Sequence, residues 1–225
     1  KGFDPETGGL FSAVVESVLG KQTPYAVISG PTFAEELAEG KPAAITLAAN
    51  NIQNPDALAR QMSNKSLRVY LSDDPAGVQL GGGLKNIIAI AAGVSDALKM
   101  GANARAALVT RGLSEIKLLG KKLGGNEKTF MGLSGMGDLM LSCTDDQSRN
   151  RLLGLSIGKG LSFKEAIALK NSVPEGAHAI KTLVEKNIVT DKEPIMFAVY
   201  QVLYGGLDVS KVAEELMLRP IRGEL

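Results

Sequence analysis

One lysine interrupts an otherwise apolar segment of the chain. The segment GGGLKNIIAIAAGV covers residues 81–94, and Lys85 follows three glycines directly. A helix over 84–98 would place the large apolar side chains on one stripe and Lys85 on a neighbouring face of small side chains. A desolvated lysine close to a helix N-terminus has two reasons for a lowered pKa, so it could act as a general acid or base. The alternative is a lysine that reaches water from a helix end.

A second charged residue lies in surroundings that do not suit a charge. Asp138 follows a glycine in SGMGDLML, residues 134–141. A carboxylate among glycines and apolar side chains requires a partner, and Lys85 is the candidate. Asp96 lies eleven residues after Lys85, about 16 Å further along a helix, which is too far for an ion pair. The alternative is that Asp138 is an exposed residue at the start of a helix.

Three consecutive polar residues precede an expected helix over 149–158. Ser148 and Asn150 are of the types that cap helix N-termini, and Arg149 lies between them. Backbone N–H groups at a helix start bind anions, and an arginine beside them favours phosphate. The alternative is an ordinary capped helix with a surface arginine.

The segment ISGPTFAEE, residues 28–36, marks a junction between an expected strand and an expected helix. The strand ends at Gly30, and Thr32 with Glu35 has the spacing of a capping box. Backbone N–H groups at such a junction commonly face a ligand. The alternative is a tight turn between a strand and a helix.

The composition excludes several classes of function. The formal net charge is +1, so no bulk charge favours nucleic acid or an anionic membrane. A single cysteine, Cys143, excludes an internal disulfide and suggests a reducing compartment, and one histidine, His178, makes a zinc site improbable. No uncharged run is long enough to predict a membrane span. The first residue is Lys1, which suggests a fragment or a processed product.

The periodicity predicts an α/β part followed by an all-α part. Helices over 10–20, 32–40 and 54–64 alternate with strands over 25–30, 43–49 and 67–71, which is typical of a layered α/β unit. The strands then stop. The remaining helical patterns cover 84–98, 103–123, 127–132, 149–158, 162–170, 176–186, 194–204 and 209–218. We therefore expect two domains, 1–75 and 76–225.

Four long segments, taken in order, resemble one known family. They are ISGPTFAEELAEGKPAAITLA, VQLGGGLKNIIAIAAGVSDALKMGANARAALVTRGLSE, FMGLSGMGDLMLSCTDDQSRN and PEGAHAIKTL. Together they resemble the bacterial-type NAD(P)-dependent glycerol-3-phosphate dehydrogenases over nearly the whole chain. No G-x-G-x-x-G fingerprint occurs in the sequence. The resemblance therefore implies that the N-terminal, glycine-rich half of the Rossmann domain lies upstream of Lys1.

The resemblance implies a fold, an activity and its setting. Residues 1–75 would form the C-terminal part of an NAD(P)-binding Rossmann domain, and 76–225 a helical substrate domain. The activity would be the reversible reduction of dihydroxyacetone phosphate to sn-glycerol 3-phosphate for glycerophospholipid synthesis in the cytoplasm. The partners would be this small substrate and NAD(P)H, with neither nucleic acid nor a metal. A homodimer is an expected arrangement, because the family is often dimeric.

The resemblance also assigns roles around the lysine. Lys85 matches the catalytic lysine that gives a proton to the ketone oxygen, and Asn86 matches an active-site polar group beside it. Asp138 matches an aspartate that holds the lysine and a substrate hydroxyl. Lys1 matches a second active-site lysine that contacts substrate and cofactor.

Further contacts follow from the same resemblance. Gly30 and Thr32 match substrate contacts. Ser148, Arg149 and Asn150 match the phosphate site. The cofactor contacts would be Ala34, Val173, Glu175 and Arg149.

Other expectations concern the fragment and the rival functions. Without the upstream segment, we expect these 225 residues to hold NAD(P)H weakly and to be inactive alone. His178 departs from the family pattern and is expected to be structural or exposed, and Cys143 to be a small buried residue. The alternative functions are a helical dimerisation or interaction module and a related hydroxyacid dehydrogenase. The interaction module predicts that Lys85→Ala leaves activity intact. The related dehydrogenase predicts that Arg149→Ala has little effect on activity.

Overall fold

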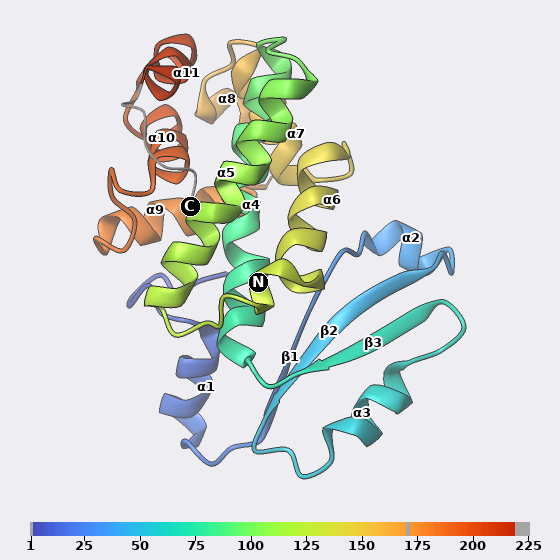
Figure 1. Ribbon diagram of the computed structural model, residues 1–225. Coiled ribbons are helices and arrows are strands. Elements are labelled where there is room, and N and C mark those ends of the chain that lie inside the picture. Colours follow the sequence, from blue (N-terminus) through green and yellow to red (C-terminus); the bar gives the residue numbers. More distant parts are fainter. Residues whose placement is uncertain (1, 170–171, 219–225) are drawn as a thin grey trace.

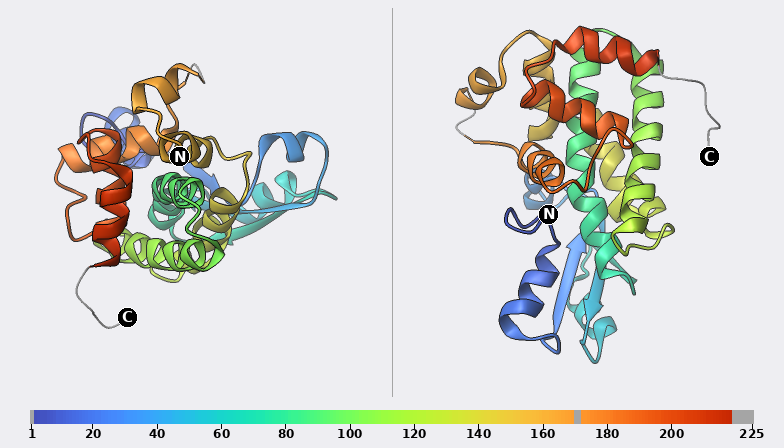
Figure 2. Two further views of the ribbon diagram at one scale, coloured as in Figure 1. Left: turned by 90° about the horizontal axis from the view of Figure 1, so that it is seen from above. Right: turned by 90° about the vertical axis from the view of Figure 1, so that its left-hand side faces the viewer.

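The computed structural model describes residues 2–169 and 172–218. A small sheet with short helices lies at one end of the molecule, and a bundle of helices lies at the other (Figure 1). One long helix, α4 (Pro75–Ala97), runs through the middle of the bundle, as the view from above also shows (Figure 2). The predicted order, an α/β part followed by an all-α part, is confirmed.

The sheet has three strands in the order β1 (Tyr25–Ser29), β2 (Ala43–Asn50) and β3 (Leu67–Ser72). β1 pairs antiparallel with β2, and β2 pairs parallel with β3. Three helices accompany the strands: α1 (Phe11–Leu19), α2 (Ala34–Ala38) and α3 (Pro55–Met62). α3 packs on the sheet through a small apolar core, which consists of Ile45, Leu47, Ala59 and Val69.

Helix α4 is the central element of the main core. Asp74 caps its N-terminus by accepting from the N–H of Gly77, and Pro75 occupies the first turn, where a missing N–H costs nothing. By length and composition α4 is the one helix in the described residues that could cross a membrane, but 83% of its most apolar window is buried inside the protein. α4 is therefore a core helix.

Seven further α-helices complete the described fold. They are α5 (Ala102–Lys122), α6 (Asp138–Thr144), α7 (Arg149–Gly158), α8 (Phe163–Ala168), α9 (Glu175–Glu185), α10 (Pro194–Leu203) and α11 (Val209–Met217). A 3-10 turn (Thr129–Met131) and a π turn (Leu133–Gly137) connect α5 to α6. Helices α5, α6, α7, α9 and α10 all pack against α4, so the core is built around a single helix.

Three local predictions were wrong. α4 begins at Pro75 instead of residue 84, so the glycines 81–83 lie inside the helix. Thr32 and Glu35 form no capping box, because α2 begins at Ala34 and the Thr32 hydroxyl donates to the Gly30 carbonyl at 3.2 Å. The predicted helix over 127–132 is only a 3-10 turn. The border at residue 75 stays a prediction, since α4 packs on both the sheet and the bundle.

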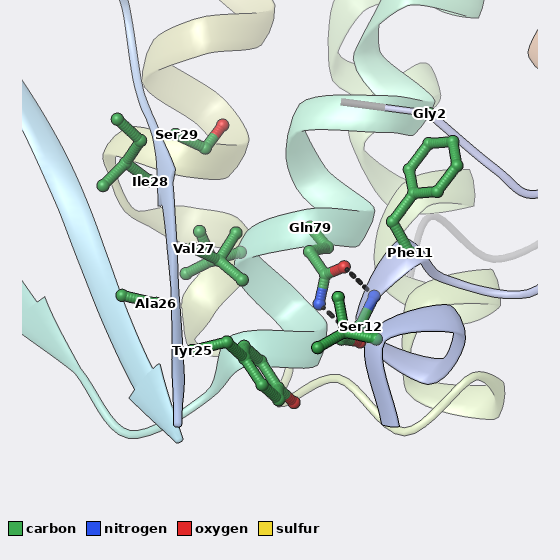
Figure 3. A pocket seen from close by; sticks show the side chains of 11 residues that line it. Gly2, Phe11, Ser12, Tyr25, Ala26, Val27, Ile28, Ser29 and Gln79 are labelled. Atoms are coloured by element: carbon green, nitrogen blue, oxygen red, sulfur yellow. Dashed lines mark hydrogen bonds between the residues drawn. The ribbon is translucent and has the colours of Figure 1, made fainter. Parts of the chain in front are cut away.

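A cleft of about 280 Å³ lies between α1 and the outer edge of β1 (Figure 3). Gln79 of α4 closes one end by accepting from the Ser12 N–H at 3.1 Å and donating to the Ser12 hydroxyl at 2.9 Å. The buried Ser29 hydroxyl on β1 has no hydrogen-bond partner among the described residues. Phe11 and Ile28 remain about half exposed beside it. β1 is an outer strand of the sheet, and its free edge, which faces α1, is apolar and partly exposed.

Candidate active site

Lys85 lies in the middle of α4 and not at its start. Its residue is only 7% exposed, so neither the helix-end position nor a side chain that reaches water is correct. The argument from an N-terminal helix dipole therefore does not apply to this lysine. What distinguishes Lys85 is burial of an ammonium group inside the core, which requires compensation by charge and hydrogen bonds.

The compensation comes from α6. The Lys85 Nζ donates to the carboxylate of Asp138 and, at 2.6 Å, to the hydroxyl of Ser142. Asp138 is 1% exposed and Ser142 is 2% exposed. The predicted pairing of Lys85 with Asp138 is confirmed, and the exposed-aspartate alternative is wrong. Ser142 was not predicted, although it follows Asp138 by four residues and so shares its helix face.

Glycines bring the two partners together. A Cβ on Gly81 of α4 would lie 2.4 Å from the carbonyl oxygen of Ser134, and a Cβ on Gly135 would lie 2.1 Å from the carbonyl oxygen of Phe130. The π turn therefore packs with its backbone directly against α4, a contact that only residues without a side chain permit. Because α6 follows this turn immediately, Asp138 arrives beside Lys85.

The loop after β1 closes the site from the side of the sheet. A Cβ on Gly30 would lie 2.9 Å from the Ala44 carbonyl oxygen, so the loop is held tightly against β2. Pro31 faces Gly137, the residue before Asp138, with 3.6 Å between its Cγ and an added Cβ. The structure thus brings Gly30 and Thr32 close to the start of α6.

The N-terminus of α7 forms the next wall. Ser148 caps the helix by accepting from the Arg151 N–H at 3.3 Å, as the sequence predicted. Arg149 is exposed on the first turn. Gln147 donates to Glu36 of α2 at 3.3 Å, so this loop lies beside α2, where Ala34 is exposed at the first turn.

A chain of amides links α7 to the lysine helix and to α9. The Asn150 amide nitrogen donates to the Asn86 side-chain oxygen at 3.0 Å, and the Asn150 oxygen accepts from the Gly176 N–H at 2.8 Å. Asn86 in turn donates to the Gly82 carbonyl at 3.4 Å. Because Asn86 directly follows Lys85, the chain ties the starts of α7 and α9 to the lysine.

The segment before α9 meets the beginning of the chain. A Cβ on Gly2 would lie 2.1 Å from the Glu175 carboxylate, so Glu175 packs on the Gly2 backbone. Val173 is half-buried in the same segment. Lys1 lies outside the described residues.

The lone cysteine and histidine take no part in the site. Burial raises the pKa of the Cys143 thiol to about 12, which leaves it protonated and unreactive, in agreement with the prediction of a small buried residue. His178 is exposed on α9. Among the described residues no group of three His, Cys, Asp or Glu side chains could hold a metal ion.

The residues present would suit one part of a dinucleotide. A buried ammonium with its carboxylate, the exposed start of α2 and the Glu175 segment converge on one region, which fits the reacting end of such a cofactor. The sequence contains no G-x-G-x-x-G fingerprint, the motif whose turn binds a pyrophosphate. The arrangement can protonate an oxygen and can hold an anion at the start of α7.

Comparison with known proteins gives one consistent result. Residues 1–55 match the model for the N-terminus of NAD-dependent glycerol-3-phosphate dehydrogenase, and residues 74–214 match the model for its C-terminus. A glycerol-3-phosphate dehydrogenase [NAD(P)+] of Haemophilus influenzae strain PittEE is 50% identical over all of this chain and 68% of its own length. That of Pasteurella multocida strain Pm70 is 49% identical over all of this chain and 67% of its own length.

A solved structure agrees with these relatives. The crystal structure of a glycerol-3-phosphate dehydrogenase from Coxiella burnetii superposes with a TM-score of 0.91 at 44% identity, over 97% of this chain and 67% of that one. The sheet and the helical bundle described above therefore follow a fold known from an enzyme. By sequence and by structure, the chain belongs to the family of NAD-dependent glycerol-3-phosphate dehydrogenases.

Proposed function

We propose that the protein reduces dihydroxyacetone phosphate reversibly to sn-glycerol 3-phosphate with NAD(P)H. The observation that carries this proposal is the buried ion pair of Lys85 and Asp138. Pro31, in the loop of Gly30 and Thr32, approaches Gly137, the residue before Asp138. Family membership supports the reaction, and the geometry supports a separate role for each residue of the site.

Lys85 is the proposed proton donor. Reduced nicotinamide, when bound, supplies the hydride that makes a carbonyl carbon into a carbinol carbon. Negative charge then develops on the oxygen, and the Lys85 ammonium stabilises it and transfers a proton to it. Asp138 and Ser142 hold the Lys85 Nζ in place, and Asp138 also accepts from a substrate hydroxyl.

The start of α7 is the proposed phosphate site. The exposed Arg149 guanidinium and the free backbone N–H groups of the first turn bind the phosphate, with Ser148 beside them. Asn150 uses its side chain to join Asn86 and Gly176, so it serves the site by fixing this turn and by its remaining N–H. Gly30 and Thr32 contact the substrate from the opposite loop.

The cofactor would lie across the same region. Ala34 at the start of α2, Arg149, and Val173 with Glu175 before α9 are its proposed contacts, and Lys1 is a proposed contact of both cofactor and substrate. The uncovered edge of β1 would accept the further strands of a Rossmann sheet, which carry the pyrophosphate site. We therefore propose that these 225 residues alone bind NAD(P)H weakly and do not turn over.

The proposal also covers the pathway, the compartment and the assembly of the enzyme. The product is the glycerol backbone for glycerophospholipids, and we propose a cytoplasmic enzyme, with a homodimer as its assembly. An interaction module without activity would give no reason to bury an ammonium group against a carboxylate. A hydroxyacid carries a carboxylate that the same arginine can bind, so it is the family match that favours the phosphorylated substrate.

The test uses a chain extended to the length of the relatives, hereafter the extended chain. We expect it to reduce dihydroxyacetone phosphate with NADH or NADPH, and Lys85→Ala to lower kcat by at least about 100-fold with an unchanged circular dichroism spectrum. Lys121→Ala is the matched control, because Lys121 is an exposed lysine paired with Glu127 on the surface of α5. No turnover by the wild-type chain would refute the proposed function. If Lys85→Ala turned over like wild type, the proposed reaction would stand and the proposed role of Lys85 would be refuted.

A further inference from the structure

We propose that Arg151 is a positioning residue for the substrate phosphate. Arg151 does not contact the substrate; it holds the start of α7 at a set place on α4 and so sets the separation between the phosphate site and Lys85. The inference rests on the proposed function, since it concerns the same substrate.

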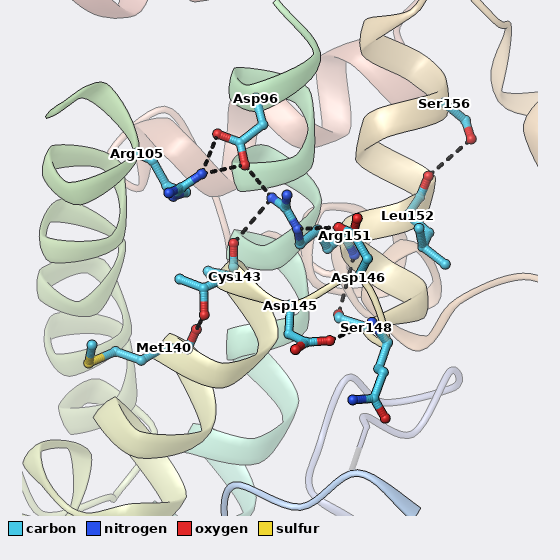
Figure 4. A network of polar contacts seen from close by, with 12 residues as sticks. Asp96, Arg105, Met140, Cys143, Asp145, Asp146, Ser148, Arg151, Leu152 and Ser156 are labelled. Carbon is cyan, nitrogen blue, oxygen red and sulfur yellow. Dashed lines mark hydrogen bonds and ion pairs between the residues drawn. The ribbon is translucent and has the colours of Figure 1, made fainter. Parts of the chain in front are cut away.

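The Arg151 guanidinium joins the turn that precedes α7 to α4 and to the end of α6. Its Nε donates to Asp146 at 2.9 Å, and its Nη1 donates to Asp96 and, at 3.3 Å, to the Cys143 carbonyl (Figure 4). The Arg151 backbone N–H donates to Ser148. One buried side chain therefore connects the end of α6, the turn and α7 with α4.

The partner of Arg151 on α4 is Asp96, which also binds α5. Asp96 accepts from the Arg105 Nη1 with both oxygens, at 3.0 and 2.9 Å, in addition to its ion pair with Arg151. Asp96 is on the same helix as Lys85, eleven residues further along. Because α4 is continuous from Pro75 to Ala97, the positions of Lys85 and Asp96 are fixed relative to each other.

The two helices also touch through their backbones at this point. A Cβ on Gly93 would lie 2.1 Å from the Arg151 carbonyl oxygen, and a Cβ on Gly154 would lie 2.0 Å from the Ile90 carbonyl oxygen. Such contact leaves no space for α7 to move toward α4. The ion pair of Arg151 with Asp96 opposes movement of α7 away from α4 and along α4. The position of α7 along α4 is therefore defined.

The two arginines of the first turn have different tasks. Successive residues of a helix are rotated by about 100°, so Arg149 and Arg151 point to nearly opposite sides of α7. Arg151 lies between two carboxylates, and Arg149 is exposed. Burial opposes the charge of Arg151, but the hydrogen bonds that its guanidinium donates to Asp96 and Asp146 outweigh this effect and raise the pKa of Arg151. Arg149 is thus the ligand for the anion, and Arg151 fixes the turn that presents it.

The experiment compares two substrates of the extended chain, dihydroxyacetone phosphate and dihydroxyacetone. Arg151→Met removes the three guanidinium contacts and keeps much of the side-chain volume. We expect KM for dihydroxyacetone phosphate to rise at least tenfold, and the preference for the phosphorylated substrate, as a ratio of kcat/KM values, to fall at least tenfold. All assays use saturating NADH, because Arg149 is also a proposed cofactor contact, and Arg151→Lys should recover part of the preference.

Arg105→Met is the matched control, because Arg105 binds the same Asp96 carboxylate from α5 without touching the turn before α7. In Arg105→Met, the preference for dihydroxyacetone phosphate over dihydroxyacetone should stay within twofold of wild type. If Arg151→Met does not fold, Asp96→Asn tests the same ion pair with the same expected loss of preference. Equal loss of both activities in the variants, with an unchanged ratio, would overturn the inference and leave the proposed function intact. A wild-type chain without activity on dihydroxyacetone phosphate would overturn both.

Discussion

Lys85 and Asp138 are 53 positions apart in the sequence and form a buried ion pair between α4 and α6. Each charge depends on the other, because an isolated charge in the core would cost several kcal/mol, on the order of 3–5 kcal/mol when one partner of a buried pair is removed. The pair therefore links the stability of the bundle to the chemistry of the site.

Replacement of the carboxylate tests this link. Asp138→Asn should lower the free energy of unfolding by about 3 kcal/mol and reduce kcat strongly, since the buried Lys85 loses its counter-ion. Urea unfolding and steady-state kinetics of the extended chain measure both effects. Asp56→Asn is the control, because Asp56 is exposed in the first turn of α3. A change in unfolding free energy below about 1 kcal/mol at Asp138, the value for a surface pair, would contradict the prediction.

Ser142 is expected to act through Lys85. Ser142→Ala removes one hydrogen bond to the Lys85 ammonium, worth about 1–1.5 kcal/mol, so kcat should fall about five- to tenfold while KM for dihydroxyacetone phosphate stays nearly constant. Ser156→Ala removes a hydroxyl that donates to the Leu152 carbonyl within α7 and should leave kcat unchanged. Equal kcat values for Ser142→Ala and wild type would show that Asp138 alone orients the lysine.

Arg149 should determine the preference for a phosphorylated substrate. Arg149→Ala removes a charge-assisted contact worth about 1.5–3 kcal/mol, which lowers kcat/KM for dihydroxyacetone phosphate about 10- to 100-fold. At saturating NADH, the activity on dihydroxyacetone should hardly change, because that substrate carries no phosphate. Arg60→Ala, at an exposed position on α3, provides the control. Losses of similar size for both substrates would place Arg149 outside the phosphate site.

Glu115 should make the stability depend on pH. It is buried on α5 and accepts from the N–H groups of Ile195 and Met196 at the start of α10, and burial raises its pKa to about 7. The folded protein therefore binds a proton between about pH 4.5 and 7 that the unfolded chain releases, so the contribution of Glu115 to stability decreases as pH rises through this window.

Urea unfolding at intervals from pH 4.5 to 8 measures this contribution. The difference in unfolding free energy between wild type and Glu115→Gln should change by a few kcal/mol in favour of wild type at the acid end, since glutamine does not titrate. Parallel curves for the two proteins over this range would contradict the assignment to Glu115.

Gly93 should tolerate no side chain. Gly93→Ala places a Cβ against the Arg151 carbonyl oxygen, so α4 and α7 must separate, at a cost of about 2–3 kcal/mol of unfolding free energy. Gly137→Ala is the matched control, because the nearest atom would lie 3.6 Å from its Cβ. An unchanged thermal midpoint for Gly93→Ala would show that the two helices have room to move.

Local patterns in the sequence determined many of the elements. The α7 helix was predicted over 149–158 and is found there with Ser148 as its cap, and the three strands lie within two residues of their predicted bounds. These features depend on contacts within a few residues, such as the cap and the alternation of apolar side chains. The sequence also contains the long motifs that indicate the family.

Tertiary structure alone decided which further residues support the Lys85–Asp138 pair. The start of α4 was predicted nine residues too late, because the glycines 81–83 lie inside the helix, where Gly81 gives room to the π turn and Gly83 to Phe3. The Lys85–Ser142 hydrogen bond, the amide chain from Asn86 to Gly176 and the Arg151–Asp96 ion pair were not predicted. Each joins residues far apart in the chain, and such contacts depend on the packing of backbones against one another, which no local pattern records.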